Sequence, residues 1–123
     1  MNRRPLVVLA KEYVDRSNQH RLDELFPMFE TDATYRSSQF GSFSGLEQIR
    51  GMMVNFFSRF PDVNWKVDRY RTDSDDIVSF QFLMRATNID TGKLVKRLGL
   101  ETIRFGNHGR IRHIEVEISL SPL

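Results

Sequence analysis

Apolar residues recur at helical spacing in the first half of the chain. From position 6 they follow the i, i+3, i+4, i+7, i+8 pattern of an amphipathic helix, which predicts a helix over about residues 5–18. Pro5 suits the first helical position, because the N–H that proline lacks would have no partner there. A second, shorter helix is predicted from Leu22, and Pro27 should kink or shorten it. Both helices are therefore expected to turn one apolar face toward a core.

A third helix has the clearest start signal. Ser44 is followed three residues later by Glu47, the spacing of a capping box, in which each side chain bonds the other residue's backbone N–H. Pro61 should end this helix. Its apolar stripe consists of Leu46, Ile49, Met53, Phe56, Phe57 and Phe60. Together with the ten phenylalanines of the whole chain, this stripe predicts an aromatic-lined interior.

The second half of the chain alternates apolar and polar residues, as β-strands do. One short strand is predicted early, and four follow, over residues 32–38, 63–70, 77–89, 93–105 and 110–119. The segments between the last four, TDSDD, DTG and GNHG, are turn sequences at hairpin spacing. This order predicts an α+β domain in which helices pack on the concave face of a curved sheet.

One acid, Glu101, lies in the third of these later strands. It shares its side of the strand with Ile103 and Phe105. Because each side of the strand is mixed, the pattern leaves Glu101 open between a solvated surface charge and a buried acid. On its side the pattern predicts a mostly apolar pocket, with Tyr13 as a second polar group. Besides the helix stripes, the expected walls are Phe80, Phe82, Met84, Ile103 and Val116.

Composition limits the class of protein. With 123 residues, 40% of them hydrophobic, the chain supports one domain with a substantial core. The absence of Cys excludes disulfides and thiolate chemistry and fits a cytoplasmic location. The net charge is only +2, and basic residues alternate with acidic ones on the hairpins, so no nucleic-acid partner is expected. The apolar run PLVVLA is too short for a signal peptide or a membrane span, so no membrane association is expected.

Motifs for metal, nucleotide or nucleophilic chemistry are missing. The three histidines, His20, His108 and His113, have no paired ligand spacing. There is no glycine-rich phosphate loop, and GSFSG has Phe43 rather than Ser at its centre, unlike a nucleophile elbow. The expectation is a protein with no metal and no cofactor.

Three segments, EYVDRSNQHRLDELFPMFETDATYRSS, FSGLEQIRGMM and LETIRFGNHGRI, resemble the nuclear transport factor 2 superfamily, and within it the SnoaL-like and ketosteroid-isomerase-like proteins. The resemblance covers nearly the whole chain, so residues 1–123 are expected to form a single domain. It implies a cystatin-like cone, with N-terminal helices on the concave face of a curved, mostly antiparallel sheet of four to six strands.

Ketosteroid isomerases hold an oxyanion between a tyrosine of the first helix and a carboxylic acid of a late strand. The resemblance puts Tyr13 and Glu101 at these positions, with Glu in place of the family's Asp. A carboxyl group buried among Phe and Ile has a raised pKa and can donate a hydrogen bond in its neutral form. The same register puts Ser37 at the position of the general base, and a neutral hydroxyl cannot abstract a proton α to a carbonyl. The chain is therefore not expected to be a standard ketosteroid isomerase.

Several functions stay open at this point. The favoured one is binding of a small apolar molecule with a carbonyl or phenol group in an enclosed pocket of about 300 Å³ or more. Catalysis as a cofactor-independent isomerase, cyclase or dehydratase is a second, and a non-catalytic dimerisation or interaction module a third. In a further alternative without any binding function, Tyr13 and Glu101 would form a hydrogen bond with each other inside a fully packed core.

A homodimer through the sheet face is expected in every case, because two-fold dimers are the commonest assembly. The residues expected to bind the ligand beside Tyr13 and Glu101 are Phe29, Tyr35, Phe56, Phe57, Phe60, Phe80, Phe82, Met84, Ile103 and Val116.

Overall fold

A computed structural model describes residues 5–119, which form a curved six-stranded sheet with helices on its inner side. In chain order the elements are α1 (Leu6–Asn18), α2 (Leu22–Leu25), the 3-10 helix η1 (Phe26–Met28), β1 (Phe29–Ser37), β2 (Gly41–Ser44), α3 (Leu46–Arg59), β3 (Asn64–Ser74), β4 (Ile77–Thr87), β5 (Leu94–Phe105) and β6 (Ile111–Ile118). The strand order is β2-β1-β6-β5-β4-β3, and only the pair of β1 with β6 is parallel. The predicted cystatin-like α+β fold is confirmed.

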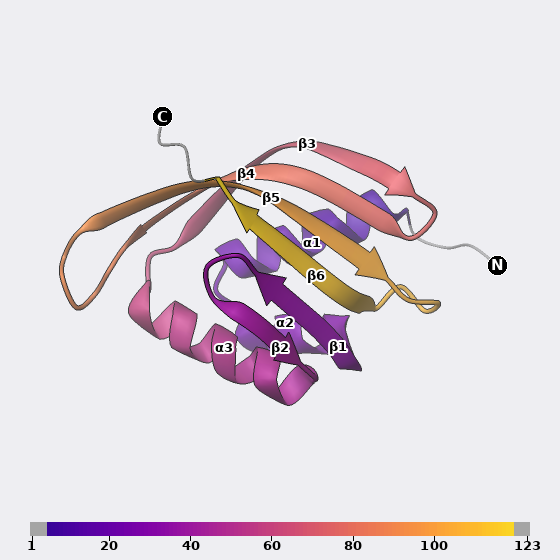
Figure 1. The fold of residues 1–123 in the computed structure, drawn as a ribbon, viewed down its shortest axis with the longest axis horizontal. Helices are drawn as coiled ribbons and strands as arrows, with labels where there is room; N and C mark the ends of the chain where they lie inside the picture. The colour runs from indigo at the N-terminus through magenta and orange to yellow at the C-terminus, as the bar shows by residue number, and fades with distance from the viewer. Residues whose placement is uncertain (1–4, 120–123) are drawn as a thin grey trace.

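The sheet arches over the helices. Figure 1 shows the long strands β3, β4 and β5 curving over α1, while α3 lies below β1 and β2 at the open side of the arch. A break in the β3–β4 register between Asp68 and Arg71, where Arg69 has a φ of 64°, adds to this curvature. The hollow beneath the arch is the place where side chains of the helices and of the sheet meet.

Helix α1 begins one residue later than predicted. Pro5 is its N-cap, with an extended ψ of 137°, and the buried face consists of Ala10, Tyr13, Val14 and Ser17. At the other end Asn18 fixes the helix to β3 through both of its amide atoms. Its Nδ2 donates to the carbonyl oxygen of Trp65 (2.9 Å), and the N–H of Trp65 donates to its Oδ1 (2.7 Å). This clamp sets the position of α1, and therefore of Tyr13, under the sheet.

The predicted capping box of α3 is wrong. Ser44 is the last residue of a strand, β2, that the sequence pattern did not reveal, and Gly45 is the N-cap. Gly45 has a φ of 87°, which favours glycine and turns the chain sharply from the strand into the helix. The N–H of Ser44 donates instead to the side chain of Gln48 (2.8 Å). Pairing with β1 keeps Ser44 extended, and this overrides the local signal of the capping box.

The register of the sheet lines up four residues across the concave face. Ser37 of β1 pairs with Val116 of β6, Val116 with Glu101 of β5, and Glu101 with Phe80 of β4. Residues of one cross-strand row project to the same face, so this row crosses the floor of the hollow. The predicted ends of these strands differ from the observed ones by at most three residues, the largest difference being at the start of β1.

Candidate functional site

A cavity lies between the concave face of the sheet and helices α1 and α3, with a volume of about 70 Å³. Its lining contains eight aromatic residues, seven aliphatic or sulfur-containing residues and four polar residues. These are Tyr13, Tyr35, Phe40, Phe56, Phe57, Trp65, Phe80 and Phe82; Val14, Leu25, Met52, Met53, Met84, Val116 and Ile118; and Ser17, Ser37, Arg97 and Glu101. The cavity is thus mostly apolar with a few polar groups, the usual composition of a small-molecule site.

Glu101 is buried at the centre of the cavity floor. Glu101 is only 7% exposed, and Phe80 and Val116 flank it on the neighbouring strands. One carboxyl oxygen, Oε2, is buried and has no hydrogen-bond partner. Burial raises the pKa of Glu101 from an ordinary 4.5 to about 8, because the charged form loses its solvation. At neutral pH the group is therefore mostly protonated and carries an O–H that can donate.

Tyr13 and Tyr35 approach the same cavity from α1 and β1. Burial raises the pKa of both phenols, and the nearby Glu101 carboxyl raises each further. Tyr13 packs edge-on against Phe29, with ring centroids 5.9 Å apart. Within residues 5–119 neither hydroxyl bonds another side chain, and Tyr13 does not bond Glu101. The two tyrosines therefore add two neutral O–H groups to the pocket.

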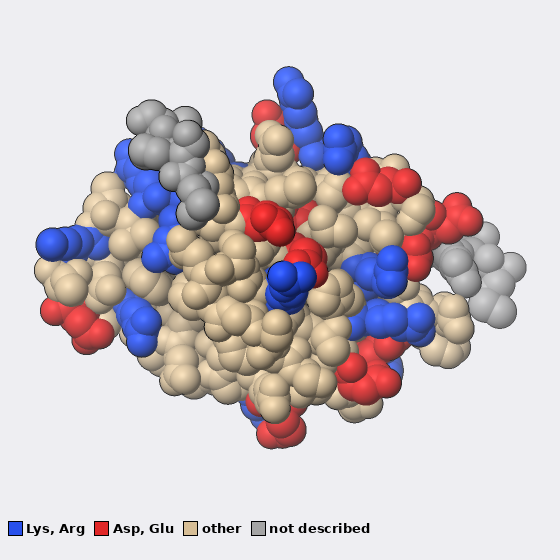
Figure 2. Space-filling model, in the orientation of Figure 1, with Lys and Arg blue, Asp and Glu red and all other residues tan. Residues whose placement is uncertain are grey.

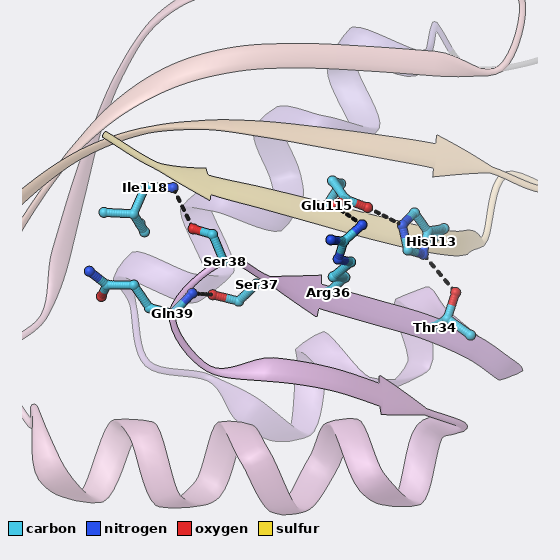
Figure 3. Close-up of polar contacts among 8 residues, drawn as sticks. All are labelled: Thr34, Arg36, Ser37, Ser38, Gln39, His113, Glu115 and Ile118. Atoms are coloured by element: carbon cyan, nitrogen blue, oxygen red, sulfur yellow. Dashed lines mark hydrogen bonds and ion pairs between the residues drawn. The ribbon is translucent and has the colours of Figure 1, made fainter. Parts of the chain in front are cut away.

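Ser37 has a local role at the end of β1. Its Oγ accepts hydrogen bonds from the backbone N–H groups of Gln39 (3.2 Å) and Phe40 (3.3 Å), and Figure 3 shows the first of these. The next residue, Ser38, accepts the N–H of Ile118 (2.9 Å), which ties the turn to β6. These bonds hold the turn that carries Phe40 into the cavity wall. Two strand spacings, about 10 Å, separate the backbones of Ser37 and Glu101.

Arg97 is a lining residue that the sequence reasoning missed. It lies four residues before Glu101 on β5, so strand alternation turns both to the cavity. Its guanidinium group lies over the ring of Phe40, 5.7 Å from the centroid, and one nitrogen, Nη1, is buried without a partner. Burial lowers the pKa of Arg97, although the group stays charged. The parity of this strand was the available signal, because Arg97 lies on the same side of the strand as Glu101.

Three of the residues expected to bind the ligand do not line the cavity. Phe29 packs behind Tyr13, and Ile103 is fully buried deeper in the sheet, next to Val78 and Ile114. Phe60 faces a separate hollow on α3, together with Phe43 and Arg59 among others. The other seven, Tyr35, Phe56, Phe57, Phe80, Phe82, Met84 and Val116, do line it, as do Tyr13, Ser37 and Glu101.

The cavity is smaller than the 300 Å³ expected from the sequence. An apolar cavity of about 150 Å³ holds a benzene molecule, so even a one-ring ligand requires some lining side chains to move. Three methionines, Met52, Met53 and Met84, are among them, and methionine adapts its shape readily. Phe40, which is 40% exposed, and the partly exposed Arg97 mark the end through which a ligand would enter.

Residues 5–119 contain no group of three or more His, Cys, Asp or Glu side chains placed to hold a metal ion. In the same part of the chain no helix is both long enough and apolar enough to cross a membrane.

Comparison with known families agrees with this architecture. The sequence model described as "SnoaL-like domain" matches residues 10–114. The chain belongs to the SnoaL-like domain family. No curated protein matched the sequence.

Three solved structures that resemble this SnoaL-like chain are distant from it in sequence. A putative hydroxylase, AclR from Streptomyces galilaeus, is 21% identical, with a TM-score of 0.80 over 95% of this chain and 90% of the other. The epoxide hydrolase/cyclase-like enzyme SalBIII, described as acting in pyran ring formation in the polyether salinomycin, is 18% identical, with a TM-score of 0.85 over 94% and 91%.

A third is a hypothetical protein with a ketosteroid isomerase-like fold from Catenulispora acidiphila, in complex with trimethylamine. It is 17% identical, with a TM-score of 0.80 over 92% of this chain and 86% of the other. At these identities the likeness establishes the fold, and the expected superfamily membership is confirmed. Function has to be argued from the residues of the site.

Proposed function

We propose that this SnoaL-like protein binds a small apolar molecule through a carbonyl or phenol oxygen, which accepts hydrogen bonds from Tyr13 and Glu101. The observation that carries the proposal is the state of these two groups. Both are buried in the wall of one cavity, both are neutral at pH 7, and neither has a hydrogen-bond partner among the described side chains.

A buried donor without a partner costs about 1–3 kcal/mol. A ligand oxygen within reach of both groups would remove this cost at Glu101 and accept a second hydrogen bond from Tyr13. The surrounding phenylalanines exclude water and lower the local dielectric constant, which strengthens both hydrogen bonds. Such paired donors favour an oxygen that carries or develops negative charge. A phenolate or an enolate is therefore expected to bind more tightly than a ketone of the same shape.

If the site is catalytic, general-acid chemistry fits it better than proton abstraction. Glu101 is the one carboxyl in the described wall of the cavity, and the hydroxyl of Ser37 is engaged in the turn and is not a base. A carboxyl with a pKa of about 8 can deliver its proton to a substrate oxygen at neutral pH. That step belongs to a cyclase or a dehydratase. The name of the cyclase-like relative SalBIII agrees with such chemistry. No metal or cofactor enters this proposal, and a cytoplasmic location is part of it.

The binding proposal is tested with phenol itself, the smallest planar ligand of the right chemistry. Trp65 is the chain's single tryptophan and lines the cavity, so its fluorescence, excited near 295 nm, reports ligand entry. Phenol should bind the wild type about tenfold more tightly than it binds either Tyr13→Phe or Glu101→Gln. A tenfold change in affinity corresponds to the loss of about one hydrogen bond. Benzene, which lacks the oxygen, should bind all three proteins alike. Equal phenol affinities in the three proteins would remove the paired-donor claim.

The reaction class has its own test. The wild type should not isomerise a Δ5-3-ketosteroid, because Ser37 is no base and the cavity is far smaller than a steroid site needs. Steroid turnover above background would contradict both points.

A second candidate, a dimerisation or protein-interaction module, rests on the outer face of the sheet. Figure 3 shows a chain of contacts there. The Thr34 hydroxyl and Nδ1 of His113 share a hydrogen bond (2.6 Å), Nε2 of His113 donates to the Glu115 carboxylate (2.8 Å), and Arg36 pairs with Glu115 (3.5 Å). Leu100 is 38% exposed on the same face. In Figure 2, basic and acidic side chains occur at both ends of the face shown and in its middle, the kind of mixed surface that suits a protein partner more than a phosphate backbone.

This candidate predicts a two-fold dimer through the sheet face. Sedimentation equilibrium should find the wild type as a dimer, and Leu100→Glu should shift it toward monomer while phenol binding stays unchanged. A monomeric wild type at about 100 μM would remove the dimer and leave the pocket proposal intact.

A further inference from the structure

Two described side chains contain a buried nitrogen or oxygen atom without a hydrogen-bond partner, and both line the same cavity. One is Glu101, through Oε2, and the other is Arg97, through Nη1. Buried polar atoms are nearly always satisfied in folded proteins, so an exception calls for an explanation. The paired-donor site accounts for Glu101 and leaves the cation of Arg97 unexplained.

The two groups do not neutralise each other. They are four residues apart on one extended strand, which puts their Cα atoms about 13 Å apart. No ion pair within 4.0 Å joins Arg97 to an acid of the described residues. Gly99 lies between them on the same side, and the ring of Phe82 occupies the place where a Cβ on Gly99 would be. An aromatic ring thus separates an acidic end of the cavity from a cationic end.

The surroundings of Arg97 favour an anion of particular shape. Its guanidinium group already has a π-face contact, with Phe40, so the unmet need is an acceptor for its N–H groups. A planar carboxylate matches the fork of a guanidinium group with two parallel hydrogen bonds. A carboxylate also needs little space, and Arg97 lies toward the exposed end of the cavity, next to the 40% exposed Phe40.

We infer that the ligand is a small aromatic or enolic carboxylate, with its carbonyl or phenol oxygen at Tyr13 and Glu101 and its carboxylate at Arg97. This inference rests on the proposed function, since it takes the Tyr13 and Glu101 end as the site of the first oxygen. It adds the substrate class: a molecule with an oxygen at one end, an apolar middle that packs against Phe82, and one negative charge at the other end.

The test uses three ligands that separate the two ends. 4-Propylphenol carries only the phenol, 3-phenylpropionate carries only the carboxylate, and 3-(4-hydroxyphenyl)propionate carries both. Each is titrated into the wild type, Glu101→Gln, Arg97→Gln and Arg85→Gln, with Trp65 fluorescence and calorimetry as readouts. Arg85 is the matched control, because it is exposed on the outer side of the neighbouring strand β4.

In the wild type the two-headed ligand should bind at least about tenfold more tightly than 4-propylphenol, as expected for a charge-assisted hydrogen bond. Arg97→Gln should remove this advantage and leave the affinity for 4-propylphenol unchanged. Arg85→Gln should preserve it. Glu101→Gln should weaken both phenols and spare 3-phenylpropionate.

The outcomes for the two proposals are distinct. If 4-propylphenol binds through Glu101 but the carboxylate adds nothing, or adds the same in Arg97→Gln, the Arg97 inference is overturned and the proposed function stands. If 3-phenylpropionate binds through Arg97 while no phenol depends on Glu101, the carboxylate site is supported and the paired-donor function fails. If the tail shortened to 4-hydroxyphenylacetate or lengthened to 4-(4-hydroxyphenyl)butyrate restores an advantage that depends on Arg97, the inference holds with a different ligand length. No such dependence at any of the three lengths overturns it.

Discussion

Replacing Glu101 by Gln should stabilise the protein at neutral and alkaline pH. Gln has nearly the shape of a protonated Glu and cannot ionise. The pKa of Glu101 is about 8 in the folded protein, against an ordinary 4.5, so between these values the folded state holds a proton that the unfolded state releases. The contribution of Glu101 to wild-type stability therefore falls as the pH rises from about 4.5 to about 8. The variant lacks this loss.

The size of the effect follows from the shift. One pKa unit corresponds to about 1.4 kcal/mol, so the stability advantage of Glu101→Gln should grow by about 3 kcal/mol between pH 4.5 and pH 7. It should level off above pH 8, at about 5 kcal/mol, because both states of the wild type are then ionised. A domain of this length has roughly 5–15 kcal/mol of stability in all, so the change is large enough to measure.

The assay is urea denaturation at half-unit steps from pH 4.5 to pH 9, with the free energy of unfolding compared between variant and wild type at each step. Glu117→Gln, which removes an exposed carboxyl on β6, is the control, and its curve should run parallel to that of the wild type. A difference for Glu101→Gln that stays constant across this range would show that the carboxyl titrates normally. If the free energy of unfolding of the wild type rises relative to that of the variant as the pH increases, Glu101 is stabilised as an anion.

Two further substitutions test the framework of the cavity, again by urea denaturation. Asn18→Ala should lower the free energy of unfolding by about 2–3 kcal/mol, because it removes both hydrogen bonds that fix α1 to the backbone of β3. Its control, Asn55→Ala on the exposed side of α3, should lower it by less than about 1 kcal/mol. Equal effects of the two substitutions would contradict the clamp. Gly99→Ala should cost about 1–3 kcal/mol and reduce phenol binding, because its Cβ would displace the ring of Phe82 into the cavity. In its control, Gly51→Ala in the middle of α3, the added Cβ meets open space, so this variant should instead be stabilised by up to about 1 kcal/mol. A Gly99→Ala protein as stable as the wild type would refute the close packing of Phe82 against Gly99.

The elements that the sequence predicted well are those whose pattern is periodic over many residues. The helix over residues 6–18 and the four later strands are set by burial along their whole length, so their ends differ from the prediction by a few residues at most. The failures lie where long-range pairing decides the local structure. Ser44 carried a helix-start signal, but pairing with β1 held it in a strand, and the turn to α3 fell to Gly45.

The candidate site was predicted in part for the same reason. Strand parity predicts which side chains share a face, but it left Glu101 open between the surface and the interior. The family resemblance put Glu101 inside, and the structure shows it buried, so the alternative of a solvated Glu101 is wrong. Parity does not say how deep a residue lies along the arch, and this is why Ile103 and Phe29 are buried beyond the cavity. Arg97 belongs to the cavity wall because it packs against Phe40, which follows the turn after Ser37. The pattern of a single strand does not contain this contact between distant segments.

The two orphaned groups distinguish a binding site from a polar pair that merely fills a core. A structural pair would be bonded, and removing one member would destabilise the fold by leaving the other unsatisfied. Glu101 and Arg97 are unbonded in the described structure, so each lowers stability as it stands. Glu101→Gln removes the ionisation of this buried carboxyl, so it should raise stability at neutral pH and weaken phenol binding in the same protein. Opposite signs in the two measurements are the mark of a group retained for its ligand rather than for the fold. A Glu101→Gln variant with lower stability and weaker phenol binding would show instead that Glu101 has a structural role in the core.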